Sequence, residues 1–341
     1  MRILFDISHP AHLNFFKNAI RKIHSLGEHQ LYITCLRRGR LPNIVLSELE
    51  GFNITCIGKH RGNIFSIIFE ANLLKFFQLL IFTKKRKIDF GISVGSFTLG
   101  AAMKLRNKPN IQFDDDPESS QNLFFERITS DEIHIPPILD ENSKFVVFNA
   151  LKEWAYLSPS YFIPNIEALK IYNLKPYEYL FIREVSSGSL NYIDQGSFTI
   201  ASFANKLDES QIVLLSLEDK SKKDLYPDKW ILLEEPVLDI HSLIYYSKCV
   251  ISSGDSMARE GSVLGRPSIY CGRREMKVND IMKNRKLFFH LKPFEVPIFI
   301  MNLDKLCIVF PDQKEYRASL NDEWDDVTVH ILNSINRIAN L

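Results

Sequence analysis

The chain has 341 residues, of which 45% are hydrophobic and 24% charged, and its formal net charge is +1. These values are typical of a folded globular protein long enough for two domains, and they exclude a global electrostatic field that would recruit nucleic acid. The five cysteines lie far apart, without CxxC or zinc-ligand spacing, and predict reduced thiols in a cytoplasmic protein. The apolar run at the N-terminus is too short for a signal peptide.

In the first half of the chain, β-rich runs alternate with helical segments. Strands are expected at 2–6, 30–35, 52–57, 90–94 and 110–113, and helices at 12–26, 64–82 and 96–106. This βαβ rhythm predicts a parallel sheet that carries helices on both faces.

The apolar segment 64–82 is the longest in the chain and is followed by the basic run 84–87. Because its polar and charged residues are spread over one side, we expect an amphipathic helix packed on its domain rather than a membrane span. The basic run has two interpretations. It either complements the dipole at the end of a solvated helix, or it joins the apolar helix in a peripheral contact with the inner membrane surface.

The alternation weakens across the proline- and aromatic-rich stretch 142–177, and a second alternating set follows. Its strands are expected at 179–182, 212–217, 230–233, 249–251 and 268–271, its helices at 191–207, 239–247 and 256–264, and a final helix at 322–341. The predicted fold class is α/β, with two Rossmann-like domains in tandem. The predicted boundaries are 1–150 for the first domain, 151–177 for the connection, 178–315 for the second domain and 316–341 for a C-terminal helix. Since ligands of open α/β sheets bind beyond the carboxyl ends of the strands, we expect loops there to line an interdomain cleft.

The turn at 252–256 joins a predicted strand to a predicted helix and consists almost entirely of small polar residues. Such a turn leaves backbone N–H groups available for a phosphate at the helix N-terminus, and an acidic residue one turn further in can accept hydrogen bonds from a ribose diol. The alternative is an ordinary βα turn in which Asp255 or Ser256 caps the helix. The residues predicted here to bind a nucleotide are Ser253, Gly254, Ser256, Met257 and Glu260.

A second loop, 183–188, follows the first strand of the second domain. Arg183 can neutralise a diphosphate by bidentate contact, and Ser187 in the same loop is also predicted to bind the nucleotide. The alternative for Arg183 is an ion pair with Glu184 at the end of the strand.

Two loops of the first domain carry candidate catalytic residues. His12 begins the first predicted helix near Asp6, so it is either a general base with a neighbouring orienting group or a neutral helix-capping histidine. The acidic run 114–116 has a spacing that can chelate a divalent metal, and Asp116 and the nearby Glu118 are the candidate catalytic carboxylates of this loop. The histidines beyond residue 12 show no ligand spacing and are predicted to be structural.

Four stretches together resemble the family called domain of unknown function 354: FDISHPAHLNFFKNAI, FDDDPESSQNLFF, FNALKEWAYL and SSGDSMAREGSVLGRP. That family is similar to the GT-B superfamily, which includes the lipid-II-forming N-acetylglucosaminyltransferase and the hydrolysing UDP-N-acetylglucosamine 2-epimerases. The resemblance implies that Glu260, in the spacing Glu260-x4-Gly265, holds a uridine ribose. It also implies that the first domain holds the acceptor or the sugar and that the second binds the nucleotide. The resemblance argues against a metal, so Asp116 and Glu118 are expected to orient sugar hydroxyls instead.

The chain departs from those patterns at a few positions. Pro10 and Ala11 replace glycines of the transferase loop, and Leu123 replaces an arginine of the epimerase site. Asp255 stands where relatives usually carry glycine, and an acidic residue beside a pyrophosphate is unfavourable.

The leading hypothesis is a GT-B-type glycosyltransferase that uses a nucleotide-activated sugar, with UDP as the expected nucleotide, to make a surface polysaccharide or glycolipid. Its expected partners are the nucleotide-sugar donor and a saccharide or lipid-linked acceptor, with no other cofactor. The alternatives are an enzyme similar to the UDP-N-acetylglucosamine 2-epimerases and a non-catalytic protein that binds a nucleotide sugar.

Overall fold

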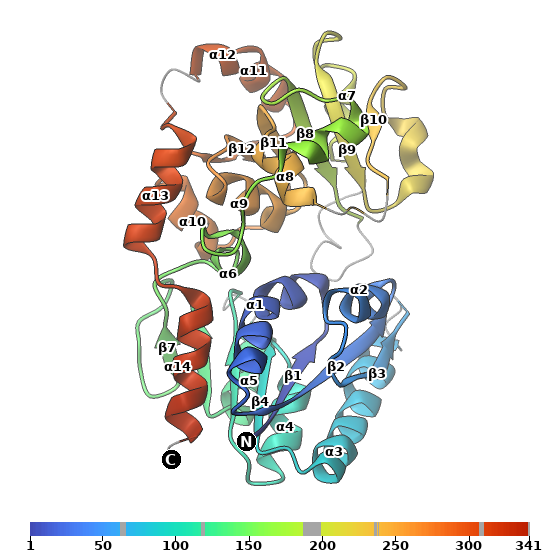
Figure 1. Cartoon of the computed structure of the whole chain (residues 1–341). Coiled ribbons are helices and arrows are strands. Elements are labelled where there is room, and N and C mark those ends of the chain that lie inside the picture. The colour runs from blue at the N-terminus through green and yellow to red at the C-terminus, as the bar shows by residue number, and fades with distance from the viewer. Residues whose placement is uncertain are drawn as a thin grey trace. The chain divides into compact units, whose positions relative to one another are not determined.

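A computed structural model of the chain describes residues 1–61, 66–116, 120–186, 199–234, 237, 239–306 and 310–339 (Figure 1). The chain forms two compact units. The first comprises Met1–Tyr156 together with Glu323–Leu341, and the second comprises Leu157–Asp322. The chain therefore leaves the first unit once and returns to it at its C-terminal end. The predicted domain boundaries divide the chain differently and stay a prediction.

The first unit is built on a parallel sheet of seven strands in the order β3-β2-β1-β4-β5-β6-β7. The strands are β1 (Arg2–Ile7), β2 (Gln30–Arg38), β3 (Ile54–His60), β4 (Phe90–Val94), β5 (Asn110–Phe113), β6 (Glu132–Ile135) and β7 (Phe145–Val147). Runs such as ILFDI in β1 are buried almost throughout, as expected for strands covered on both faces. The strand order reverses at β1, between β2 and β4, so the carboxyl ends of these strands form the edge where a ligand is expected.

Helices cover both faces of this sheet. They are α1 (Pro10–Leu26), α2 (Leu41–Glu48), the π-helix η1 (Ser66–Leu74), α3 (Lys75–Arg86), α4 (Phe97–Lys104), α5 (Ser120–Thr129), α6 (Trp154–Leu157) and α14 (Val327–Ala339). From β1 at the centre of the sheet, the chain crosses toward one edge and later toward the other. Because such crossovers are right-handed, their helices lie on opposite faces of the sheet. The contacts between helices agree with this arrangement. One group contains α1, α2 and α14, and the other contains α3, α4 and α5.

The second unit has a six-stranded parallel sheet in the order β10-β9-β8-β11-β12-β13. Its strands are β8 (Tyr179–Glu184), β9 (Ile212–Leu217), β10 (Ile231–Leu232), β11 (Cys249–Ser252), β12 (Ser268–Tyr270) and β13 (Phe288–His290). Its helices are η2 (Ile166–Tyr172), α7 (Ala201–Ala204), η4 (Lys220–Leu225), α8 (Ile240–Tyr245), α9 (Asp255–Val263), α10 (Lys277–Lys283), α11 (Val296–Met301), α12 (Leu303–Leu306) and α13 (Gln313–Glu323). The chain returns to the first unit within α13.

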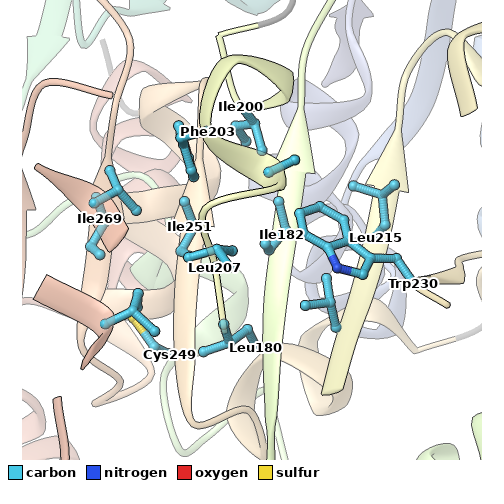
Figure 2. Close-up of a cluster of buried hydrophobic side chains, with 14 of the residues drawn as sticks. Leu180, Ile182, Ile200, Phe203, Leu207, Leu215, Trp230, Cys249, Ile251 and Ile269 are labelled. Atoms are coloured by element: carbon cyan, nitrogen blue, oxygen red, sulfur yellow. The ribbon is translucent and has the colours of Figure 1, made fainter. Parts of the chain in front are cut away.

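The core of the second unit gathers side chains from four neighbouring strands, β9, β8, β11 and β12, and from the α7 region (Figure 2). Ile182, Leu215 and Ile251 extend from the sheet, and Phe203 and Trp230 cover them. Burial of one such aliphatic side chain contributes about 1.5 to 3 kcal/mol. This packed layer holds β8 and β11 in register, and their carboxyl ends carry two of the predicted nucleotide loops.

The predicted fold class is correct, because both units are parallel α/β sheets. Three strands were not predicted from the sequence: β6, β7 and β13. The predicted final helix at 322–341 is wrong in its extent, since α13 ends at Glu323 and α14 begins at Val327. The segment 64–82 is helical where it is described, but its first part is π-helical. No helix in the described part of the chain is both long and apolar enough to span a bilayer.

Candidate functional site

The turn between β11 and α9 presents the uncapped N-terminus of a helix. Gly254 occupies the N-cap position, and no side chain of the described residues caps α9. The alternative that Asp255 or Ser256 caps the helix is therefore wrong. Because the first N–H groups of a helix have no intrahelical acceptor, the start of α9 offers donors and a positive dipole to an anion. Ser256 and Met257 lie half-buried in this first turn.

The charge of Asp255 is neutralised inside the protein. Its carboxylate accepts a hydrogen bond from Arg259 at 2.6 Å, and the two side chains are only 2% and 0% exposed. Arg259 also donates to the Asn279 side chain at 2.8 Å and to Ser256 Oγ at 3.3 Å. The acid that stands in place of a glycine is therefore paired, so its charge does not oppose an anion at this turn.

Glu260 follows in α9, one turn in from the N-terminus, as the spacing predicted. One carboxylate oxygen lies 3.6 Å from His241 Nε2, and both side chains keep some exposure, 11% and 15%. His241 is the second residue of α8, whose N-cap is Asp239. His241 was predicted to be structural because its neighbour Glu260 is 19 positions away in the chain.

The loop after β8 touches the same turn. Ser253 is buried, and its hydroxyl accepts a hydrogen bond from the Val185 N–H at 2.9 Å. Arg183 donates to Ser216 Oγ at 2.9 Å and lies 4.0 Å from Glu218. Arg183 thus remains near the carboxyl edge, while Ser187 lies outside the described residues.

The proposed ion pair between Arg183 and Glu184 is not formed. Glu184 is on the opposite face of β8, buried, where it accepts hydrogen bonds from Tyr226 Oη at 3.0 Å and from the Ile200 N–H at 2.7 Å. Burial raises the pKa of Glu184 even though these donors favour its ionised form.

The loop after β12 is basic and was not predicted from the sequence as part of the site. Gly272 lies so close to the turn that an added Cβ would be 2.6 Å from the Ser253 carbonyl oxygen. Arg273 is exposed and Arg274 half-buried directly after this contact. The loop could have been predicted from its two adjacent arginines, which directly follow a strand of the parallel sheet. Loops at the carboxyl ends of such strands lie at the edge where ligands bind.

At the carboxyl edge of the first unit, His12 is half-buried and neutral. Its Nδ1 accepts a long hydrogen bond, 3.4 Å, from the Ser8 N–H. Burial, and secondarily the cations around it, lower the pKa of His12 well below its ordinary value. The helix cap is His9, whose Nδ1 accepts from the Ala11 N–H at 3.2 Å, so the capping alternative for His12 is wrong.

The expected partner of His12, Asp6, is engaged elsewhere. Asp6 accepts hydrogen bonds from Lys75 Nζ at 2.6 Å, Ser96 Oγ at 2.6 Å and Thr34 Oγ1 at 2.8 Å. Lys75 also donates to Ser8 Oγ at 2.7 Å, so this buried network supports the loop that carries His12. Sequence reasoning missed it because Lys75 looked like part of a polar helix face.

The acidic run after β5 forms a desolvated carboxyl cluster with α5. Asp114 accepts from the Asp116 N–H at 2.9 Å, and Asp115 pairs with Lys152 at 2.6 Å. Glu126 is 1% exposed, and its Oε2 makes no hydrogen bond within the described residues. Burial, followed by the neighbouring carboxyl groups, raises the pKa values of both Asp114 and Glu126, so this pair retains a proton near neutral pH.

Glu118 and Leu123 were the other two residues of interest in this region. Glu118 lies outside the described residues and stays a prediction. Leu123, which stands in place of an epimerase arginine, packs against the apolar cluster of Ile133, Ile135 and Phe145. Among the described residues, no group of three His, Cys, Asp or Glu side chains is arranged to hold a metal ion.

The structure has the fold of the GT-B glycosyltransferases and UDP-N-acetylglucosamine 2-epimerases. The glycosyltransferase VinC in complex with DTDP is 12% identical, with a TM-score of 0.68 and coverage of 100% of both chains. The UDP-GlcNAc 2-epimerase of Neisseria meningitidis bound to UDP-GlcNAc is also 12% identical, with a TM-score of 0.71 and coverage of 99% of this chain and 100% of the other. At these identities the likeness establishes the fold alone.

Within that fold class, the chain belongs to the family described as protein of unknown function (DUF354), whose model matches residues 1–336. The family resemblance read from the four motifs is therefore confirmed. An uncharacterized protein of Methanocaldococcus jannaschii is 25% identical over 288 residues, covering 80% of this chain and 82% of the relative.

Proposed function

We propose that the chain is a GT-B-type glycosyltransferase that takes its sugar from a UDP-sugar. The observation that carries this proposal is the turn before α9: an uncapped helix N-terminus, a neutralised Asp255, and Glu260 one turn further in. The diphosphate would meet the first N–H groups of α9, while Glu260 would accept hydrogen bonds from the ribose hydroxyls. Two solved structures of this fold are described with DTDP and with UDP-GlcNAc, which supports a nucleotide-sugar ligand here.

In this proposal the second unit stabilises the leaving group. As the sugar–phosphate bond breaks, negative charge develops on the diphosphate. The α9 dipole, Arg183 and the arginines of the β12 loop would stabilise that charge. Ser253 and Gly254 would contribute backbone rather than side-chain contacts, since the Ser253 hydroxyl already bonds to the Val185 N–H.

The first unit would supply the proton chemistry. Because His12 Nδ1 accepts from Ser8, the neutral ring carries its proton on Nε2 and can donate it in a hydrogen bond. We therefore assign the role of base toward the acceptor hydroxyl to Asp116 and assign hydrogen-bond donation to His12. Glu118 is retained in this proposal as a residue that orients the sugar.

The pathway and the location belong to the same proposal. We place the enzyme in the cytoplasm, in the synthesis of a surface polysaccharide or glycolipid, with a saccharide or lipid-linked acceptor. Metal independence is part of this hypothesis and has a direct test. EDTA should leave turnover intact, whereas loss of turnover that manganese restores would contradict the assignment of Asp116.

The test of the nucleotide site is the Glu260→Ala variant. Loss of two charge-assisted hydrogen bonds to the ribose should weaken UDP binding about a hundredfold. Isothermal titration calorimetry on the full chain measures this, with Glu178→Ala, an exposed glutamate of the same unit, as the matched control. Equal UDP affinity in the two variants would remove Glu260 from the site.

The second candidate is epimerisation at C2 of UDP-N-acetylglucosamine. The buried Asp114–Glu126 pair favours it, because epimerisation needs an acid and a base close to the sugar. The apolar packing of Leu123, where the epimerase has an arginine, favours transfer. Incubation with UDP-N-acetylglucosamine in deuterated water separates the two. Deuterium at C2 or free N-acetylmannosamine, formed without an acceptor, would establish the epimerase instead.

A further inference from the structure

The helical segment formed by η1 and α3 exposes a line of large apolar side chains. Phe69, Leu73, Phe77 and Ile81, which we call the α3 stripe, are each between 46% and 67% exposed. They recur every four residues. A turn of the π-helix η1 holds more residues than a turn of the α-helix α3. Side chains four residues apart therefore remain nearly aligned along the helix axis where η1 joins α3. The stripe is therefore one continuous surface feature.

The inward side of the same helix carries polar groups. Lys75 and Thr83 are 3% and 0% exposed, and Lys75 makes the 2.6 Å ion pair with Asp6. Gln78 Oε1 accepts a hydrogen bond from the Gly58 N–H at 2.7 Å. These contacts fix the rotation of α3, so the stripe cannot turn inward without breaking a buried ion pair. Within the described part of the first unit, the four side chains of the stripe therefore keep about half or more of their surface exposed.

Cations follow directly along the stripe. Lys84, Lys85, Arg86 and Lys87 are all exposed at the end of α3, and Lys85 occupies the next position of the four-residue spacing. Leu105, 67% exposed, lies nearby, because the adjacent Arg106 donates to the Ile88 carbonyl at 3.0 Å. An apolar strip that ends in four cations complements a surface with anionic headgroups above an apolar interior.

We propose that the α3 stripe and the basic run 84–87 bind the surface of an anionic phospholipid bilayer. The apolar side chains would enter the boundary between headgroups and acyl chains, and the cations would pair with phosphates. A second copy of the chain could also cover the stripe, but it would bring a further run of cations rather than the opposite charge. Binding to the bilayer does not depend on the proposed transfer reaction. Only the idea of a lipid-linked acceptor rests on that reaction.

Vesicle co-sedimentation with the full chain tests this surface. Vesicles of phosphatidylcholine with phosphatidylglycerol should bind the protein, and vesicles of phosphatidylcholine alone should bind at least about tenfold less. Phe77→Ser/Ile81→Ser should reduce binding about tenfold or more. The matched control is Phe294→Ser/Ile298→Ser, the same residue types at the same spacing in the second unit, 63% and 57% exposed. This control should bind like the unaltered chain.

A second variant tests the contribution of the basic run 84–87. Lys84→Gln/Lys85→Gln should weaken binding to anionic vesicles about tenfold and reduce its salt dependence, whereas Lys170→Gln/Lys175→Gln should not. Equal binding by the stripe and control variants would overturn the proposal. A dimer in sedimentation velocity that dissociates in Phe77→Ser/Ile81→Ser would assign the stripe to a second copy instead. UDP affinity, measured in parallel, should be unchanged in every variant, so failure here leaves the nucleotide site standing.

Discussion

Each unit carries one buried ion pair near the carboxyl edge of its sheet, and the two pairs differ in what they join. Asp6 and Lys75 lie 2.6 Å apart with 0% and 4% exposed side chains, and Asp255 and Arg259 lie 2.6 Å apart with 2% and 0%. The first pair connects β1 to α3, 69 positions away. The second lies within one helix, four positions apart.

The comparison shows that similar charge geometry can serve two purposes. The long-range pair determines how a helix packs on the sheet and supports the Ser8 loop. The local pair joins two residues of the same helix, although Arg259 also donates to Asn279 of α10, and it cancels an acidic charge at the proposed phosphate turn. Removal of the cation should therefore affect the fold in the first case and the ligand in the second.

Lys75→Met should have the largest effect. Loss of the cation leaves Asp6 buried without a charge partner, which costs about 3 to 5 kcal/mol of the free energy of unfolding. Urea denaturation measures this, and Asp6→Asn/Lys75→Met should recover most of the loss. The control is Lys17→Met, which removes a 3.7 Å surface pair with Glu48 and should cost less than about 1 kcal/mol. Similar losses in the two single variants would contradict a structural role for Lys75.

Arg259→Met should have a smaller effect on stability, about 2 kcal/mol, because the α9 dipole partly stabilises the remaining Asp255 carboxylate. UDP affinity should fall roughly thirtyfold as the unpaired carboxylate opposes the diphosphate. Asp255→Asn/Arg259→Met removes both charges and should restore UDP binding in calorimetry. If UDP affinity stays unchanged in Arg259→Met, the diphosphate does not bind at this turn.

Part of the fold and part of the site could be predicted from the amino-acid sequence. Most of the strands, the turn before α9 and the position of Glu260 were predictable because they depend on short-range patterns: apolar runs, small turn residues and helical spacing. The network around Lys75 and the pairing of Asp114 with Glu126 were not, because their partners are distant in the chain. Arg259 was overlooked beside Asp255, although an i,i+4 acid–base spacing predicts such a pair. A single sequence does not show which of many such contacts are buried.

A histidine pair in the first unit predicts a pH-dependent loss of stability. His134 Nδ1 lies 2.8 Å from His330 Nε2 of α14, and His134 Nε2 lies 3.1 Å from Glu132. Burial lowers the pKa of both histidines, that of His330 to about 4. The unfolded chain binds these protons near pH 6.5, so the stability is complete above that value and is lost as the pH falls toward 4.

Unfolding by urea at pH 7 and at pH 5 should therefore differ by about 1 to 2 kcal/mol through these histidines. His330→Gln should reduce this difference, because glutamine cannot take up the proton. His24→Gln, which alters an exposed histidine of α1, provides the control. The same pH dependence in His330→Gln as in the unaltered chain would show that the pair does not couple to folding.

Glu126→Gln should change the free energy of unfolding in the stabilising direction. Burial raises the pKa of Glu126 to about 9, so the folded chain holds it protonated while the unfolded chain releases the proton near pH 4.5. The stability is therefore complete below pH 4.5 and declines as the pH rises toward 9. A glutamine is neutral at every pH and can donate to Asp114 as the protonated carboxyl does, so the variant should match the unaltered chain at pH 4 and be more stable than it at pH 8. Thermal unfolding at the two pH values measures this, and a destabilised variant at pH 8 would mean that Glu126 is ionised in the fold, leaving the proposed epimerase chemistry without its acid.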